Sequence, residues 1–155
     1  MNVTKPMLYN YLKIAHIVSA ALLLTSMAYS FFLWTYIQKP RHTTIISPRI
    51  QTQTWLFIIP AAIFQLGTGF TMISVHHEEL SQLWISGSVI GFIIVIGSWF
   101  SFVYFLLLSQ QVATKPVQNQ PRFALFKRAQ SMMLSICGLA LLSMIFLMAN
   151  KVTTF

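Results

Sequence analysis

The chain has 155 residues, of which 56% are hydrophobic and 8% charged, and its mean hydropathy is +0.70. Soluble domains carry roughly 25% charged residues, so this composition excludes a water-soluble globular protein and indicates an integral membrane protein. The formal net charge is +8. However, the Lys and Arg residues lie between and beside apolar runs, which argues against a nucleic-acid-binding protein and for the positive-inside bias of membrane proteins.

Four apolar segments are long enough to cross a membrane, because a helix needs roughly 20 apolar residues to span the hydrocarbon core. In chain order they cover about residues 14–38, 55–75, 83–108 and 129–150. Polar, basic, Pro-containing connections follow the first and third segments, and the short "HHEELSQ" follows the second. Short connections favour antiparallel neighbours. We therefore predict one transmembrane domain over residues 1–155, an all-α four-helix bundle with up-down-up-down topology.

The distribution of positive charge predicts the orientation of this bundle. The two basic connections contain Lys39, Arg41, Arg49, Lys115, Arg122, Lys127 and Arg128. The opposite side holds Lys5, Lys13 and Lys151. This asymmetry predicts a bacterial inner-membrane protein with the basic connections in the cytoplasm and both termini outside. The only acids, Glu78 and Glu79, would then lie outside.

Polar side chains at membrane depth are costly and tend to face the interior of a helix bundle. At 100° per residue, His16 shares a face of the first span with Ser19, Leu23, Met27 and Ser30. Gln65 shares a face of the second span with several neighbours. These are Ala61, Ala62, Thr68, Gly69, Met72 and His76. We expect both faces to point inward, with Gln65 and Thr68 as interior polar residues.

If these two spans are antiparallel, His16 and His76 lie at similar depth near the outer side. Two facing imidazoles can hold a b-type haem axially or a soft metal ion, and Met72 is a further soft ligand. The candidate cofactor-binding residues are therefore His16, His76 and Met72, and Glu78 or Glu79 would orient a ligating ring. In the alternative interpretation, His16 hydrogen-bonds to a neighbouring helix and His76 only ends its span. No nucleophile–base pair, phosphate loop or Cys pair is present, so we predict no catalytic residues.

Small residues indicate where helices can approach closely in lipid. Gly87 and Gly91 form such a pattern in the third span, and Ser131 and Ser135 form one in the fourth. They fit helix packing inside the bundle, contact with another membrane subunit, or self-association. In the second span, Pro60 lacks a backbone donor, and we expect a kink there.

Three stretches carry a resemblance to known families: "YLKIAHI", "TWLFIIPAAIFQLGTGFTMI" and "FLMANKV". Together they resemble a bacterial family of four-helix integral membrane proteins of unknown function, over nearly the whole chain. The Leu-Lys-x-x-His pattern is more distantly similar to HemJ-type oxidases and CopD-like copper proteins. That resemblance implies a haem ligand at His16, although "SFFLWTYIQ" lacks the arginine that the HemJ type carries in its first helix.

Two functions therefore remain open at this stage. One is a haem- or metal-binding membrane protein with His16 as the principal ligand. The other is a non-catalytic membrane subunit or assembly factor that packs against other transmembrane helices. A transporter has little support, because Gln65 is the only strongly polar residue expected in the bundle interior apart from the histidines.

Overall fold

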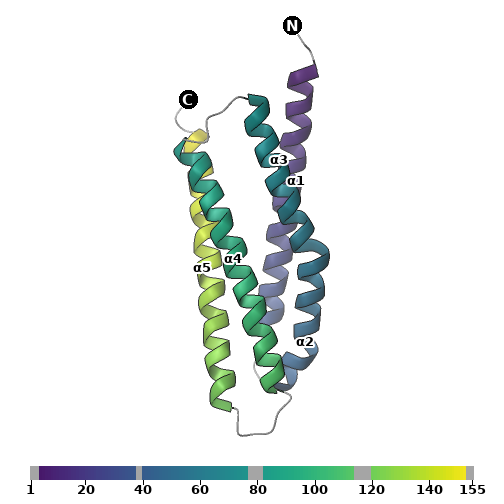
Figure 1. The fold of residues 1–155 in the computed structure, drawn as a ribbon, viewed down its shortest axis with the longest axis vertical. Coiled ribbons are helices and arrows are strands. Elements are labelled where there is room, and N and C mark those ends of the chain that lie inside the picture. The colour runs from purple at the N-terminus through teal and green to yellow at the C-terminus, as the bar shows by residue number, and fades with distance from the viewer. Residues whose placement is uncertain (1–3, 38–39, 77–81, 114–119, 153–155) are drawn as a thin grey trace. The chain divides into compact units, whose positions relative to one another are not determined.

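A computed structural model of the chain describes residues 4–37, 40–76, 82–113 and 120–152. Its elements are α1 (Thr4–Thr35), α2 (Pro40–Gln53), the π-helix η1 (Thr54–Ile58), α3 (Ile59–His76), α4 (Leu83–Ala113) and α5 (Gln120–Val152). Figure 1 shows these helices in chain order. The described ranges contain no strand, and the predicted all-α class is confirmed.

Four helical segments are long and apolar enough to cross a membrane: Met7–Thr35, His42–Val75, Leu83–Ala113 and Pro121–Leu147. The helices are longer than the predicted spans. The 31 residues of α4 extend about 46 Å at 1.5 Å per residue, whereas the hydrocarbon core is about 30 Å thick. Apolar runs mark the part of a helix inside the hydrocarbon, and the helix continues beyond it because its backbone bonds remain satisfied in the interface.

The first basic connection differs from the prediction, because most of it is helical. Pro40 begins α2, and proline is tolerated in a first helical turn because its missing N–H has no partner there. Thr43, Ser47 and Ile50 follow at helical spacing, and all three are fully buried. The Pro and Thr content was typical of a loop, but this buried stripe at spacings of four and three stabilises a helix.

The expected distortion at Pro60 takes the form of the π-helix directly before it. Proline cannot donate to the carbonyl four residues back, which here belongs to Leu56. The neighbouring Ile59 N–H bonds to the Thr54 carbonyl, five residues back. The extra residue in this turn accommodates the missing donor while the helical segment continues.

Contacts divide the chain into two compact units. The first comprises Met1–Phe32 and Thr52–Leu80, and it contains most of α1 together with η1 and α3. His16 bonds to Thr68 and Ser30 bonds to Gln53. His16, in the first half of α1, thus contacts Thr68 in the second half of α3. Ser30, near the end of α1, contacts Gln53 just before η1. Within this unit the two helices are therefore antiparallel, as predicted.

The second unit comprises Leu33–Gln51 and Ser81–Phe155. Its centre is the pair α4 and α5, which lie side by side in Figure 1. The buried residues of α4 all lie on one side of the helix: Ile85, Gly91, Phe92, Val95, Ser98, Trp99, Phe102, Leu106 and Ser109. This helix is apolar on all sides, so the buried stripe shows which side packs and which side is left to lipid.

Close packing between α4 and α5 depends on two glycines. A Cβ atom at Gly91 would lie 2.5 Å from Met144 Cγ, and one at Gly87 would lie 2.8 Å from Leu147 Cδ1. Both glycines therefore pack against α5 of the same chain. By contrast, Ser131 and Ser135 on α5 are exposed, and the Ser135 hydroxyl donates to the Ser131 carbonyl.

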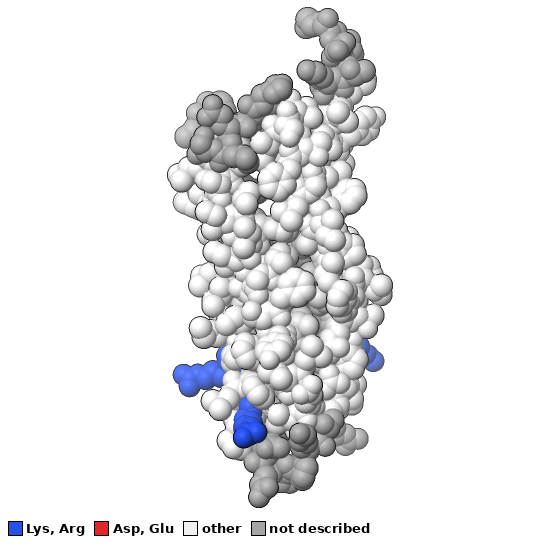
Figure 2. Space-filling view, in the orientation of Figure 1, with Lys and Arg blue, Asp and Glu red and all other residues white. Residues whose placement is uncertain are grey.

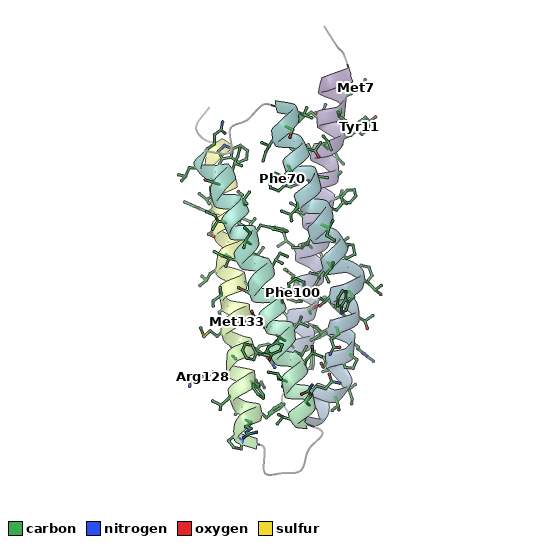
Figure 3. All side chains as sticks on the ribbon, in the orientation of Figure 1. Met7, Tyr11, Phe70, Phe100, Arg128 and Met133 are labelled. Atoms are coloured by element: carbon green, nitrogen blue, oxygen red, sulfur yellow. The ribbon has the colours of Figure 1, made fainter. Side chains whose placement is uncertain are left out.

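Four positive charges of the second unit lie at one of its ends. Ser47 of α2 bonds to Gln110 near the end of α4, and Gln130 of α5 bonds to the Phe105 carbonyl. The start of α5 and the body of α2 therefore both lie beside the last turns of α4. These two helices carry Arg49, Arg122, Lys127 and Arg128, whereas Lys151 lies in the last turn of α5. Figure 3 labels Arg128 on α5.

Apolar side chains cover most of the exposed surface. Met7 and Tyr11 project from α1 and are 62% and 72% exposed, and Phe70 and Phe100 are also exposed (Figure 3). Most of the face in Figure 2 is white, without Lys, Arg, Asp or Glu. A surface of this kind fits hydrocarbon rather than water.

Gly91→Ala tests the glycine contact between α4 and α5. The new methyl group would press on Met144 Cγ, an inner atom of that side chain, so overpacking should cost about 1–3 kcal/mol. The measurement is reversible unfolding in detergent micelles. Gly97→Ala is the matched control on the same helix, because a Cβ there meets nothing within 4 Å. Equal stability of the two variants would contradict the packing described.

Candidate functional site

The described residue that combines ionisable chemistry with polar partners on another helix is His16 of α1. Its ring lies against α3, where Gln65, Thr68 and Gly69 occupy positions i, i+3 and i+4 and so share one face. On α1, Ser19 lies one turn after His16 and joins the same cluster. Ser19 and Thr68 are buried, while His16 and Gln65 are half-buried.

Both nitrogens of the His16 ring have a side-chain partner. Nδ1 lies 2.9 Å from Thr68 Oγ1, and Nε2 lies 2.9 Å from Gln65 Nε2. The Ser19 hydroxyl donates to Gln65 Oε1, at the other end of the same amide. The cluster is therefore a continuous chain of hydrogen bonds from Thr68 through His16 and Gln65 to Ser19.

Counting protons along this chain assigns the tautomer of His16. The Thr68 hydroxyl donates to the Phe64 and Gln65 carbonyls of its own helix, so its oxygen accepts from His16. Nδ1 therefore carries the ring proton. Nε2 is then the bare nitrogen, and it accepts from the Gln65 amide. His16 is accordingly neutral in this arrangement, with every polar atom of its ring satisfied.

Gly69 allows the ring to lie directly on α3. A Cβ atom at this position would lie 3.3 Å from His16 Cε1, closer than ordinary van der Waals contact. Any larger residue would push the ring away from Gln65 and Thr68. The glycine therefore sets the distance at which the two hydrogen bonds form.

The same unit contains a second polar contact, away from His16. Gln53 Nε2 donates to the Ser26 carbonyl at 3.2 Å, and the Ser30 hydroxyl donates to Gln53 Oε1 at 3.2 Å. Neither Gln53 nor its partners can titrate. This contact, like the His16 cluster, contains a glutamine amide that bonds to another helix, but it contains no ionisable group.

The second unit has a buried polar cluster that the sequence analysis did not identify. Gln130 of α5 is 1% exposed and donates to the Phe105 carbonyl and to Ser109 Oγ, each at 3.0 Å. Its Oε1 accepts from Trp34 Nε1 at 2.8 Å. A single glutamine within an apolar span could have indicated this cluster, as it indicated Gln65 in the second span.

Of the other predicted ligands, only Met72 has a described side chain. Met72 is half-buried on the same face of α3. The side chain of His76, like Glu78 and Glu79, lies outside the described residues. Among the residues that are described, no group of three or more His, Cys, Asp or Glu side chains could hold a metal ion.

The predicted inward faces agree with the observed burial. On α1 the buried residues are Ser19, Leu23, Ser26, Met27 and Ser30, and on α3 they are Ala61, Ala62 and Thr68. Exposed residues such as Ile17 and Phe64 lie on the opposite sides. The helical period therefore located the face of each helix that carries the cluster.

Comparison with known proteins gives one family. Residues 10–152 match the family described as "Predicted integral membrane protein (DUF2269)". The chain belongs to this family. No curated protein and no solved structure matches the chain significantly. Family membership thus agrees with the membrane fold and assigns no activity.

A haem or metal ion requires a bare ring nitrogen on its histidine ligand. Here Nδ1 carries a proton and Nε2 is occupied by the Gln65 amide. A metal ion at His16 would therefore have to displace the Gln65 amide from Nε2. What the arrangement can do is join two membrane helices through a neutral imidazole.

Thr68→Val tests whether the bond to His16 stabilises the fold. Thr68 and Thr71 both donate to the carbonyl four residues back, but only the Thr68 oxygen meets His16. Interhelical hydrogen bonds in membranes average about 0.6 kcal/mol and reach about 1.7. We expect Thr68→Val to lose about 1 kcal/mol in micellar unfolding and the matched Thr71→Val to lose little. Equal losses would show that the His16 bond contributes nothing.

Proposed function

We propose that this chain is a non-catalytic membrane subunit or assembly factor that docks other transmembrane helices. The observation that carries the proposal is the saturation of His16, whose two ring nitrogens are both used between α1 and α3. The ionisable group of this site thus has a structural partner for each of its polar atoms. In the described cluster, the polar side chains bond to one another across the two helices.

The docking surface in this proposal is one face of α5. Ser131 and Ser135 are exposed one turn apart, and a Cβ at Gly138 would meet nothing within 4 Å. Residues 131, 135 and 138 share a face at helical spacing. Small residues let helix backbones approach closely where lipid supplies no hydrophobic drive. Gly87 and Gly91 do not belong to this surface, because Leu147 and Met144 already fill the space above them.

The double substitution Ser131→Leu with Ser135→Leu tests the docking surface. In mild detergent the wild-type particle should have a protein mass well above the 17.7 kDa of one chain, measured by native mass spectrometry. Leucine at both positions should block close approach and reduce the mass to that of a single chain. Ser143→Leu is the matched control, since Ser143 is also exposed on α5 but lies about 120° away from Ser131. A wild-type protein that runs as a single chain would refute the proposal.

The competing hypothesis is a b-type haem or metal ion held by His16, with His76 or Met72 as its partner. In this hypothesis a ring nitrogen of His16 loses its hydrogen bond to Gln65 or Thr68 and binds the metal. We expect protein purified from haem-replete cells to be colourless and to contain no stoichiometric iron or copper. The visible spectrum and metal analysis measure this. A Soret band that disappears in His16→Ala would establish the haem protein instead.

We also propose that the chain lies in a bacterial inner membrane with its basic connections in the cytoplasm. Arg49, Arg122, Lys127 and Arg128 lie at one end of their unit, which supports this orientation, because cytoplasmic loops carry the excess of Lys and Arg. Both termini and the segment with Glu78 and Glu79 would then face outward.

Cysteine labelling tests this orientation in a Cys137→Ala chain. An impermeant maleimide added to intact cells with a permeabilised outer membrane should modify Glu79→Cys. Asn119→Cys, in the second basic connection, should react only after the inner membrane is opened. The reverse pattern would overturn the orientation without affecting the fold.

A further inference from the structure

We propose that His16 is a reversible proton-binding site within the membrane, and that the Gln65 amide reverses its direction when the proton binds. This goes beyond the proposed docking function and does not depend on it. The inference rests on the hydrogen bonds around the ring. Their donors and acceptors can be arranged in two ways without moving the ring or either helix.

The neutral form is the arrangement described above. Nδ1–H donates to Thr68, the Gln65 amide nitrogen donates to Nε2, and Ser19 donates to Gln65 Oε1. Ser19 and Gln65 thus both donate in the direction of Nε2, whereas the Nδ1–H group donates away from the ring to Thr68. The bare Nε2 is the one ring atom where a further proton can bind.

The protonated form requires Nε2 to donate, so its partner must become an acceptor. Rotating the Gln65 amide by half a turn places Oε1 where the nitrogen was, 2.9 Å from Nε2. The amide nitrogen then donates to Ser19 Oγ. The Ser19 hydroxyl, released from Gln65, has a second acceptor already in place, because the His16 carbonyl lies 2.9 Å from its oxygen. Each polar side-chain atom of the cluster again has a partner.

The bond between His16 and Thr68 is the same in both forms. Nδ1 carries a proton in each, and the Thr68 hydroxyl remains bonded to its own helix. Proton binding therefore changes two rotations, at Gln65 and Ser19, and leaves the ring held against α3. Such a site can take up a proton without separating the two helices.

No acid in the described part of this unit compensates the added charge. Residues 54–75 contain no Asp, Glu, Lys, Arg, His, Tyr or Cys. The other titratable residues of α1 within the unit are Lys5, Tyr9, Tyr11, Lys13 and Tyr29. Among the described residues, dipoles would stabilise the imidazolium: Thr68 Oγ1, the reversed Gln65 carbonyl, and the chain through Ser19. The Gln65 oxygen is the acceptor that exists only for the charged form.

The test is a pH titration of the full chain, labelled with ¹⁵N-histidine and studied by NMR in lipid. Signals of His16 are those absent from His16→Asn. At high pH we expect a protonated Nδ1 and a bare Nε2, and as the pH falls both nitrogens should become protonated. Gln65→Leu removes the acceptor of the charged form, whose hydrogen bonds are about twice as strong as neutral ones. Proton binding should then weaken about tenfold, or one pH unit at the midpoint.

Gln53→Leu is the matched control, because it removes an amide from the same unit that bonds only Ser26 and Ser30. Its midpoint should equal that of the wild type. A neutral ring with its proton on Nε2, a ring that never protonates before the protein unfolds, or an unchanged midpoint in Gln65→Leu would each overturn the proposal. These outcomes leave the docking function untouched, since that function is tested by particle mass.

Discussion

Polar atoms inside a bilayer have no water to bond, so each must find its partner within the protein. Between the described helices, glutamines provide several of these bonds. Gln65 bonds His16, Gln53 bonds the Ser26 carbonyl, Gln130 bonds the Phe105 carbonyl, and Gln110 accepts from Ser47. Each of these bonds joins two helices within one unit. An uncharged amide offers a donor and an acceptor on one side chain, which suits contacts between helices that cannot carry a net charge cheaply.

The helices and their inward faces were predictable because the physics behind them is local. Apolar length alone determines which segments cross a membrane, and the 3.6-residue period places His16, Ser19, Leu23 and Ser30 on one side of a helix. Burial follows this period closely on α1. Polar residues inside an apolar run are costly, so their presence at Gln65 and Thr68 already indicated an inward face.

The partners of His16 were not predictable, because they depend on the register between two helices. An antiparallel pair can shift by one turn without changing either face, and the sequence favoured His76 as the residue opposite His16. The structure brings Gln65 and Thr68 to the ring, while the side chain of His76 lies outside the described residues. The helical α2 was missed for a different reason. Its Pro and Thr residues have low helix propensity, and the burial of Thr43 and Ser47 that offsets this is a tertiary effect.

Glycine has two distinct roles in this chain: close packing of two helices, and close approach of a hydrogen-bonded ring. At Gly91 the missing side chain admits Met144 of the neighbouring helix, so it serves packing. At Gly69 it admits an imidazole, and the contact sets the hydrogen-bond length rather than filling space. A ring held this closely by Gly69 and Thr68 cannot follow a moving partner. Any rearrangement at His16 must therefore fall on side chains that can rotate in place, which here are Gln65 and Ser19.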